Sequence, residues 1–124
     1  MLARLSIRDI VLIDQLDLEL SHGLTILTGE TGAGKSILLD SLSLALGARG
    51  DGALVRHGQA QGQVAATFDL PPAHPAFQIL AAQDIVANGE LILRRVQMAD
   101  GRTRAFINDQ SVSAQTLRAV ASDL

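Results

Sequence analysis

Alternating hydrophobic and polar residues predict β-strands in several parts of the chain. Segments 2–9 and 10–20 both show the period-two pattern of half-buried strands, and their proximity in the sequence predicts an antiparallel pair. Asp100-Gly101 is a typical hairpin turn between two later strands. The later strands are predicted at 63–70, 90–98 and 102–107.

Three segments are predicted to be helical. The segment 37–46 is apolar almost all round and is followed by Gly47, so we expect a buried helix that ends at this glycine. A short helix is predicted at 73–83. Ser113 is a suitable N-cap for a last helix at 114–124.

A glycine-rich sequence stands between a predicted strand, 24–28, and the helix 37–46. It matches the phosphate-binding pattern G-x-x-x-x-G-K-[ST] at every fixed position. Its residues are Gly29, Glu30, Thr31, Gly32, Ala33, Gly34, Lys35 and Ser36. Strand, loop and helix in this order are the context in which the motif binds nucleotides, and this is the predicted function. The alternative is a loop that only joins a strand to a helix.

The residue types in this loop fit the chemistry of a phosphate chain. Its glycines allow successive backbone N–H groups to point at phosphate oxygens, and the helix N-terminus adds unpaired N–H groups and the positive end of its dipole. Lys35 is the only lysine in the chain and is expected to reach the β- and γ-phosphates. The Ser36 hydroxyl is expected to bind Mg²⁺.

The composition is that of one compact domain. The chain has 124 residues, of which 48% are hydrophobic and 19% charged, and this balance excludes a disordered chain. Its net charge of −3 provides no basic surface for nucleic acid, so DNA binding by this segment alone is expected to be weak. The chain has no cysteine and no secretory or membrane signal. We therefore expect a cytoplasmic protein without a membrane partner.

Several arginines are candidates for contacts with phosphates. Arg49 and Arg56 lie in segment 47–62, which is predicted to be a mobile, unpacked connection. Ordinary surface arginines are the alternative reading. Four more arginines belong to the predicted hairpin, where a solvated strand face is favoured over a nucleic-acid patch. They are Arg94, Arg95, Arg102 and Arg104.

A nucleotide-hydrolysing enzyme of this class also needs a second acidic motif that holds Mg²⁺ and orients water. Asp69, at the end of an apolar strand, is the one candidate, and it leads directly into Pro71-Pro72. The last predicted helix reaches Leu124 with no stop signal. We interpret the chain as an N-terminal piece of a larger ATPase.

Two other classes remain open. A small P-loop kinase or GTPase is the first, although the guanine-recognition sequence Asn-Lys-x-Asp cannot occur because the sole lysine, Lys35, belongs to the phosphate loop. The second is a non-catalytic interaction module whose loop has become structural.

The chain resembles the N-terminal segment of the RecN family of bacterial DNA-repair proteins. The resemblance rests on the residues Leu5 to Asp9, on the phosphate loop with its flanking strand from Gly23 to Ile37, and on Leu46 to Arg49. The hairpin residues Arg104 to Asn108 and the helix start at Val112-Ser113 also match. The similarity covers essentially the whole chain.

This resemblance implies a fold and a function. RecN-type proteins are similar to SMC-type ABC ATPases, whose head is divided between the two ends of the chain with a long coiled coil between them. The implied fold is α/β: residues 1–124 would form the N-terminal lobe of a P-loop NTPase head, with antiparallel strands beside the strand–loop–helix unit. The implied ligands are ATP and Mg²⁺, and Arg49 or Arg56 would correspond to the arginine contacts that follow the phosphate loop in such heads.

The resemblance also implies partners. ATP would be sandwiched between two heads of a homodimer, and head engagement would be coupled to holding DNA during double-strand-break repair and recombination on the nucleoid. The signature motif, the second acidic motif and the catalytic glutamate belong to the C-terminal half of such a head. We therefore expect no catalytic residue, and no appreciable ATPase activity, in this segment alone.

Overall fold

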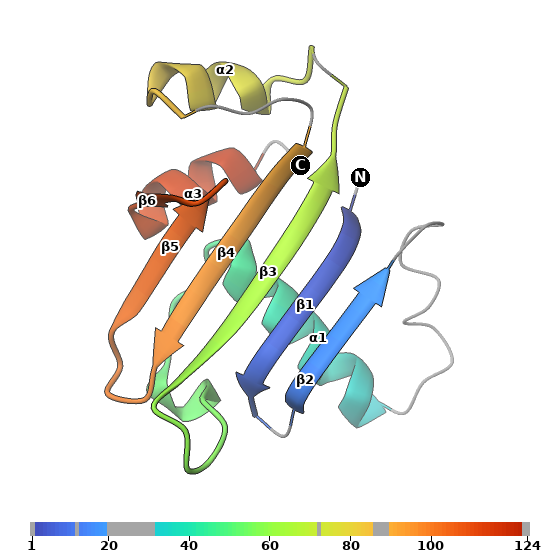
Figure 1. The fold of residues 1–124 in the computed structure, drawn as a ribbon, viewed down its shortest axis with the longest axis vertical. Helices are drawn as coiled ribbons and strands as arrows, with labels where there is room; N and C mark the ends of the chain where they lie inside the picture. Colours follow the sequence, from blue (N-terminus) through green and yellow to red (C-terminus); the bar gives the residue numbers. More distant parts are fainter. Residues whose placement is uncertain (1, 12, 20–31, 72, 86–89, 123–124) are drawn as a thin grey trace.

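The computed structural model describes residues 2–11, 13–19, 32–71, 73–85 and 90–122, and for 32–37 only the path of the backbone. Six strands form one sheet in the order β2-β1-β3-β4-β5-β6, in which every neighbouring pair is antiparallel (Figure 1). The strands are β1 (Leu2–Ile10), β2 (Ile13–Glu19), β3 (Gln61–Asp69), β4 (Glu90–Met98), β5 (Thr103–Ile107) and β6 (Gln110–Val112).

Helices cover one face of this sheet. The longest, α1, crosses behind the strands in Figure 1 and contacts β1, β3 and β4, while α3 lies against β5 and touches α2. The described helices are α1 (Gly32–Ala45), the short 3₁₀ helix η2 (Gly52–Leu54), α2 (Ala76–Ala82) and α3 (Ala114–Ala121).

The core lies between the sheet and these helices. Successive side chains of a strand point to opposite faces, so the apolar residues at every second position all meet the helices. The register confirms this arrangement, because Leu5 and Ile7 of β1 stand opposite Ala66 and Val64 of β3. Further members from β4, β5, α1 and α3 complete the buried cluster: Leu91, Leu93, Ala105, Ile107, Leu44, Leu117 and Val120.

The predicted strands are confirmed, with shifts of one to three residues at some ends. Ser113 is the N-cap of α3, and its Oγ accepts a hydrogen bond from the Thr116 backbone N–H (3.1 Å). This helix ends at Ala121, earlier than predicted. The predicted phosphate-loop strand 24–28 lies outside the described residues.

The expected burial of the first long helix is confirmed only for the side that faces the sheet. Ser41, Leu44 and Ala45 are buried against the sheet, whereas Leu39 is 41% exposed on the other side of α1. A single sheet layer covers only one side of a helix, so the remaining side of an apolar helix stays accessible. The helix also begins at Gly32, earlier than the predicted start at residue 37.

The prediction of an unpacked connection over 47–62 is wrong. Val55 is buried and forms an isolated bridge with Ile10 of β1. Two backbone hydrogen bonds flank this bridge, from Val11 N–H to the Leu54 carbonyl (2.7 Å) and from Arg56 N–H to the Asp9 carbonyl (2.8 Å). Gly52 and Gly62 of this segment allow close approach to neighbouring backbone, because a Cβ there would overlap the carbonyl oxygen of Ala99 or of Asp9.

The predicted stop of α1 at Gly47 is confirmed. Gly47 has φ +105°, and its N–H donates to the Leu44 carbonyl (3.2 Å), while the Ala48 N–H donates to the Ser43 carbonyl (3.0 Å). These two bonds make a Schellman motif, in which a left-handed glycine satisfies the carbonyls at a helix end. Arg118 of α3 packs directly against this glycine.

We expect Gly47→Ala to lower the thermal midpoint of the full-length protein by several degrees. A side chain at positive φ costs about 1–2 kcal/mol, and a Cβ here would also overlap Cγ of Arg118. Gly58→Ala is the matched control, because Gly58 has φ +87° but a Cβ there would meet nothing within 4 Å. Differential scanning calorimetry should show the larger shift for Gly47→Ala, and equal shifts would contradict the packing described here.

Candidate nucleotide-binding site

The second half of the phosphate-loop motif forms the start of α1. Gly32, Ala33, Gly34, Lys35 and Ser36 belong to its first five positions, and the earlier motif residues Gly29, Glu30 and Thr31 lie outside the described residues. The first turn of α1 contains no acidic residue. Its unpaired N–H groups and the positive end of the helix dipole can therefore attract an anion without competition from a carboxylate of their own turn.

Arg56 lies toward the same end of the molecule as the start of α1. In Figure 1 the first turn of α1, the β1–β2 connection and η2 all lie toward the lower end of the view. There the Arg56 guanidinium forms ion pairs with Asp9 (3.8 Å) and Asp14 (3.6 Å), and its side chain remains 39% exposed. Pairs this long and this exposed contribute little to stability, so the guanidinium can exchange them for another anion at small cost.

Arg49 lies at the other end of α1. A single nitrogen of Arg95, Nη1, donates to the carbonyl of Leu44 in the last turn (3.1 Å) and to the carbonyl of Ala48 (2.9 Å). Arg49 directly follows Ala48, so it lies just beyond the last turn of the helix, and its side chain is exposed. The two arginines singled out in the sequence are thus separated, because Arg49 follows the end of α1 whereas Arg56 pairs with Asp9 and Asp14.

The expected solvated arginine face on the hairpin is wrong for Arg95. This residue is 1% exposed and faces α1, because neighbouring residues of a strand point to opposite sides. Arg94 points away from α1 and lies over the ring of Phe106, 4.2 Å from its centroid. Arg102 is exposed and pairs with Asp100 (2.8 Å). Burial, and to a lesser extent the nearby Arg118, lower the pKa of Arg95.

Sequence reasoning missed Arg95 as a buried anchor. The available signal was the pair Arg94-Arg95 within a strand whose alternation places position 95 on the apolar face together with Leu91 and Leu93. Two adjacent arginines in a strand cannot both be solvated if one face of the sheet is covered.

Asp69, the one sequence candidate for a second acidic motif, ends β3 at the upper end of Figure 1, whereas α1 begins toward the lower end. A nine-residue strand spans about 30 Å, so this carboxylate is remote from the first turn of α1. Asp69 stands opposite Glu90 across the β3–β4 pair. Within the described ranges, no cluster of three or more His, Asp or Glu side chains is arranged to hold a metal ion.

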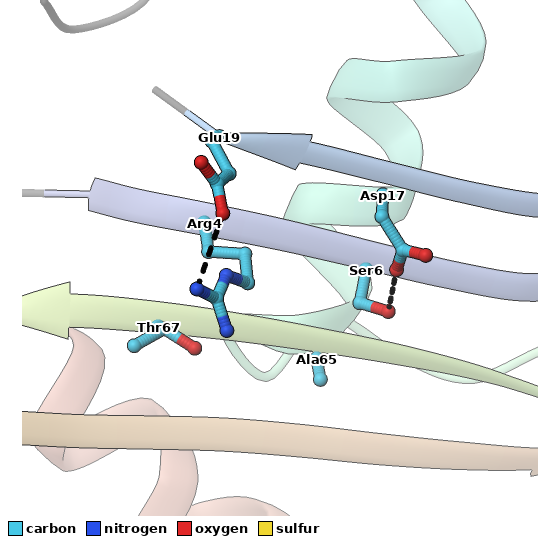
Figure 2. A pocket seen from close by; sticks show the side chains of 6 residues that line it. All are labelled: Arg4, Ser6, Asp17, Glu19, Ala65 and Thr67. Atoms are coloured by element: carbon cyan, nitrogen blue, oxygen red, sulfur yellow. Dashed lines mark hydrogen bonds and ion pairs between the residues drawn. The ribbon is translucent and has the colours of Figure 1, made fainter. Parts of the chain in front are cut away.

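A shallow hollow of about 520 Å³ lies on the sheet face opposite α1 (Figure 2). Each of its charged side chains has a polar partner: Arg4 pairs with Glu19 (3.3 Å), and Asp17 accepts a hydrogen bond from the Ser6 hydroxyl (2.6 Å) and pairs with the neighbouring Arg8 (3.1 Å). Its floor is formed by Ala65 and Thr67 of β3. The hollow therefore belongs to a separate surface from the phosphate loop.

Comparison with known proteins defines the family. The AAA domain family matches residues 4–113. The chain belongs to the AAA domain family. Its similarity to RecN is also confirmed: it is 44% identical to DNA repair protein RecN of Haemophilus influenzae, over 100% of this chain and 23% of that protein. It is likewise 44% identical to RecN of Vibrio cholerae, over 95% of this chain and 21% of that protein.

Solved structures agree with the α/β head-lobe fold of this AAA domain. A structure from work on ATP-driven dimerization and DNA-stimulated activation of SMC ATPases matches with a TM-score of 0.77 at 19% identity, over 98% of this chain and 78% of that one. An SMC head bound to the winged-helix domain of ScpA matches with a TM-score of 0.76 at 16% identity, over 98% and 40%. The fold class predicted from the sequence is therefore confirmed.

The AAA domain described here is only part of its relatives' length. The chain spans about a fifth of the RecN proteins that it matches, 23% and 21% in the two cases above. None of the helices that the structure describes is long and apolar enough to span a membrane.

We expect the contribution of Asp17, in the hollow, to the stability of the fold to decrease at acidic pH. Hydrogen bonds from Ser6 and Arg8 lower the pKa of Asp17 from its usual 3.8. A carboxylate with a depressed pKa stabilises the fold above its unfolded-state pKa, and this contribution is lost as the pH falls through the lower, folded-state value. Asp17→Asn should therefore lower the thermal midpoint at pH 7, and the difference from the wild type should shrink below about pH 4. A difference independent of pH would contradict this account.

Proposed function

We propose that residues 1–124 form the ATP-binding N-terminal lobe of an ATPase head in a RecN-like DNA-repair protein. The observation that carries the proposal is the position of the motif: its lysine and serine are the fourth and fifth residues of a helix that lies across the sheet of an AAA domain. Relatives with 44% identity are DNA-repair proteins. An ATP-binding protein of DNA repair is thus better supported than a kinase, a GTPase or a non-catalytic module.

The proposed roles follow the chemistry of the loop. Backbone N–H groups of Gly29 to Gly34 would surround the phosphates, and Lys35 would neutralise the β- and γ-phosphates. The Ser36 hydroxyl would provide one oxygen ligand to Mg²⁺, with the remaining ligands from phosphates, water and an acidic residue outside this segment. A first turn free of carboxylates fits this use. Arg56, held loosely by Asp9 and Asp14, would be available to a further phosphate oxygen.

The exposed side of α1 supports the proposal of a divided head. Leu39 is the one large hydrophobic residue in the described part of the chain that is strongly exposed, and it lies on the helix that carries the motif. We infer that the rest of the same head covers this side of α1, because the relatives are about four to five times longer than this chain. A second copy of the head and DNA are the further partners proposed for the full-length, cytoplasmic, nucleoid-associated protein. The ATP-driven dimerization of SMC ATPases supports a second copy of the head as a partner.

ATP hydrolysis is proposed for the full-length protein and not for this segment alone. The one acidic candidate, Asp69, lies at the far end of β3 from the start of α1, so it does not provide the carboxylate that activates water beside the γ-phosphate. The catalytic acid would come from the C-terminal half of the head.

We expect Mg-ATP to raise the thermal midpoint of the full-length wild-type protein but not of the Lys35→Ala variant. Ligand at 100 times its Kd stabilises the binding domain by about 2.7 kcal/mol, which corresponds to a shift of several degrees. With ATP and EDTA, the Ser36→Ala variant should show a rise in thermal midpoint, as the wild type does. Replacing EDTA by Mg²⁺ should raise the midpoint further in the wild type but not in Ser36→Ala. A scan with and without nucleotide measures both effects.

The same scan separates the alternatives. An equal shift in the wild type and in Lys35→Ala would exclude the phosphate loop as the binding site, and no shift in either would favour a non-catalytic module. ATP turnover by the purified 1–124 segment that disappears in Lys35→Ala would contradict the divided active site.

A further inference from the structure

Arg95 is a buried charge that the nucleotide site does not use directly. It lies on β4, is 1% exposed, and faces α1. In the described part of the chain no carboxylate forms an ion pair with it, and the acceptors of its hydrogen bonds there are neutral oxygens. A buried guanidinium without a counterion is costly unless its hydrogen bonds are satisfied in good geometry.

Those hydrogen bonds join three parts of the molecule. Nη1 donates to the carbonyl of Leu44 in the last turn of α1 (3.1 Å) and to the carbonyl of Ala48 just beyond the helix (2.9 Å). Nε donates to Oγ1 of Thr103 on β5 (2.6 Å). The Thr103 hydroxyl in turn donates to the Val96 carbonyl of β4 (3.2 Å). One side chain thus connects the end of α1 to the β4–β5 hairpin.

Two further contacts hold the same helix end. Arg118 of α3 packs on Gly47, and a Cβ at Gly50 would overlap Oε1 of the buried Gln97. The Gln97 amide is fixed because its Nε2 donates to the carbonyls of Met98 (3.0 Å) and Arg102 (3.2 Å). The segment that follows α1 therefore lies in close contact with the hairpin.

A positive charge is favourable at this place for a general reason. The last carbonyls of a helix have no partner within the helix, and the C-terminal end carries the negative end of the dipole. Leu44 is twelve residues from Gly32, which is about 18 Å along a helix at 1.5 Å per residue. Because a helix is stiff, a change of tilt at the Leu44 end moves the first turn, where the phosphate loop begins.

We propose that Arg95 is a positioning residue for ATP: by binding the carbonyl oxygens of Leu44 and Ala48 it fixes α1 against β4 and β5, and so fixes the first turn that receives the phosphates. This inference rests on the proposed ATP binding through the phosphate loop. Displacements of about 1 Å at a reacting or binding group are enough to change rates and affinities by large factors.

The test compares three variants of the full-length protein. Arg95→Met keeps much of the side-chain volume and removes every donor, so we expect ATP affinity to fall about tenfold, or about 1.4 kcal/mol. Arg95→Lys keeps the positive charge, but its side chain is one atom shorter than that of arginine, so it holds the Leu44 and Ala48 carbonyls less well and loses the bond to Thr103. We expect its affinity to fall about threefold. The Kd for a fluorescent ATP analogue with Mg²⁺ is measured well below the lowest thermal midpoint.

Arg94→Met is the matched control. Arg94 is the adjacent residue of the same strand, but it lies on the opposite face over the Phe106 ring. We expect this variant to lower the thermal midpoint and to leave the Kd for ATP within twofold of wild type. If Arg95 only stabilised the fold, Arg95→Met would also lower the thermal midpoint without changing the Kd. An unchanged Kd in folded Arg95→Met would therefore overturn the proposal. An equal loss of ATP affinity in Arg94→Met would overturn it as well. If Arg95→Met does not fold, wild-type affinity in Arg95→Lys would overturn it.

The Lys35→Ala variant separates a failure of the proposed ATP binding from a failure of the proposed role of Arg95. If the wild type does not bind the analogue, or Lys35→Ala binds it equally well, the proposed function fails and the proposal for Arg95 fails with it. If Lys35→Ala abolishes binding while Arg95→Met binds as the wild type does, only the positioning role of Arg95 is excluded.

Discussion

A single helix packed across one face of an antiparallel sheet is the constraint on which this structure depends. The helix buries Ser41, Leu44 and Ala45 against β1, β3 and β4. The helix begins with motif residues and ends at the Schellman turn of Gly47. Because the helix is continuous, we infer that the packing of its end by β4, β5 and α3 also positions its first turn.

Much of this arrangement could be predicted from the sequence. Period-two alternation located the strands, Asp100-Gly101 located the hairpin, and Gly47 located the end of α1, because each is a local pattern with a local physical cause. The phosphate-loop motif predicted the chemistry of the site, although its first residues lie outside the described part of the chain.

The remaining features depend on contacts between distant segments. Only the assembled sheet shows that Arg95 faces α1, that Val55 pairs with Ile10, and that Arg56 pairs with Asp9 and Asp14. The exposure of Leu39 could not be predicted either, because the sequence of an apolar helix does not show whether one or both of its sides are covered. The sequence could not predict these features because they are determined by tertiary contacts and not by the local propensity of each segment.

The central claim is that ATP binds at the first turn of α1, and hydrogen exchange of the full-length protein tests it most directly. Backbone N–H groups that bind phosphate are protected from exchange, so Mg-ATP should slow exchange in peptides that cover residues 29–40. It should leave peptides from the hollow on the opposite sheet face, around Ser6 and Asp17, unchanged. Protection at that hollow, with none at the start of α1, would contradict the account.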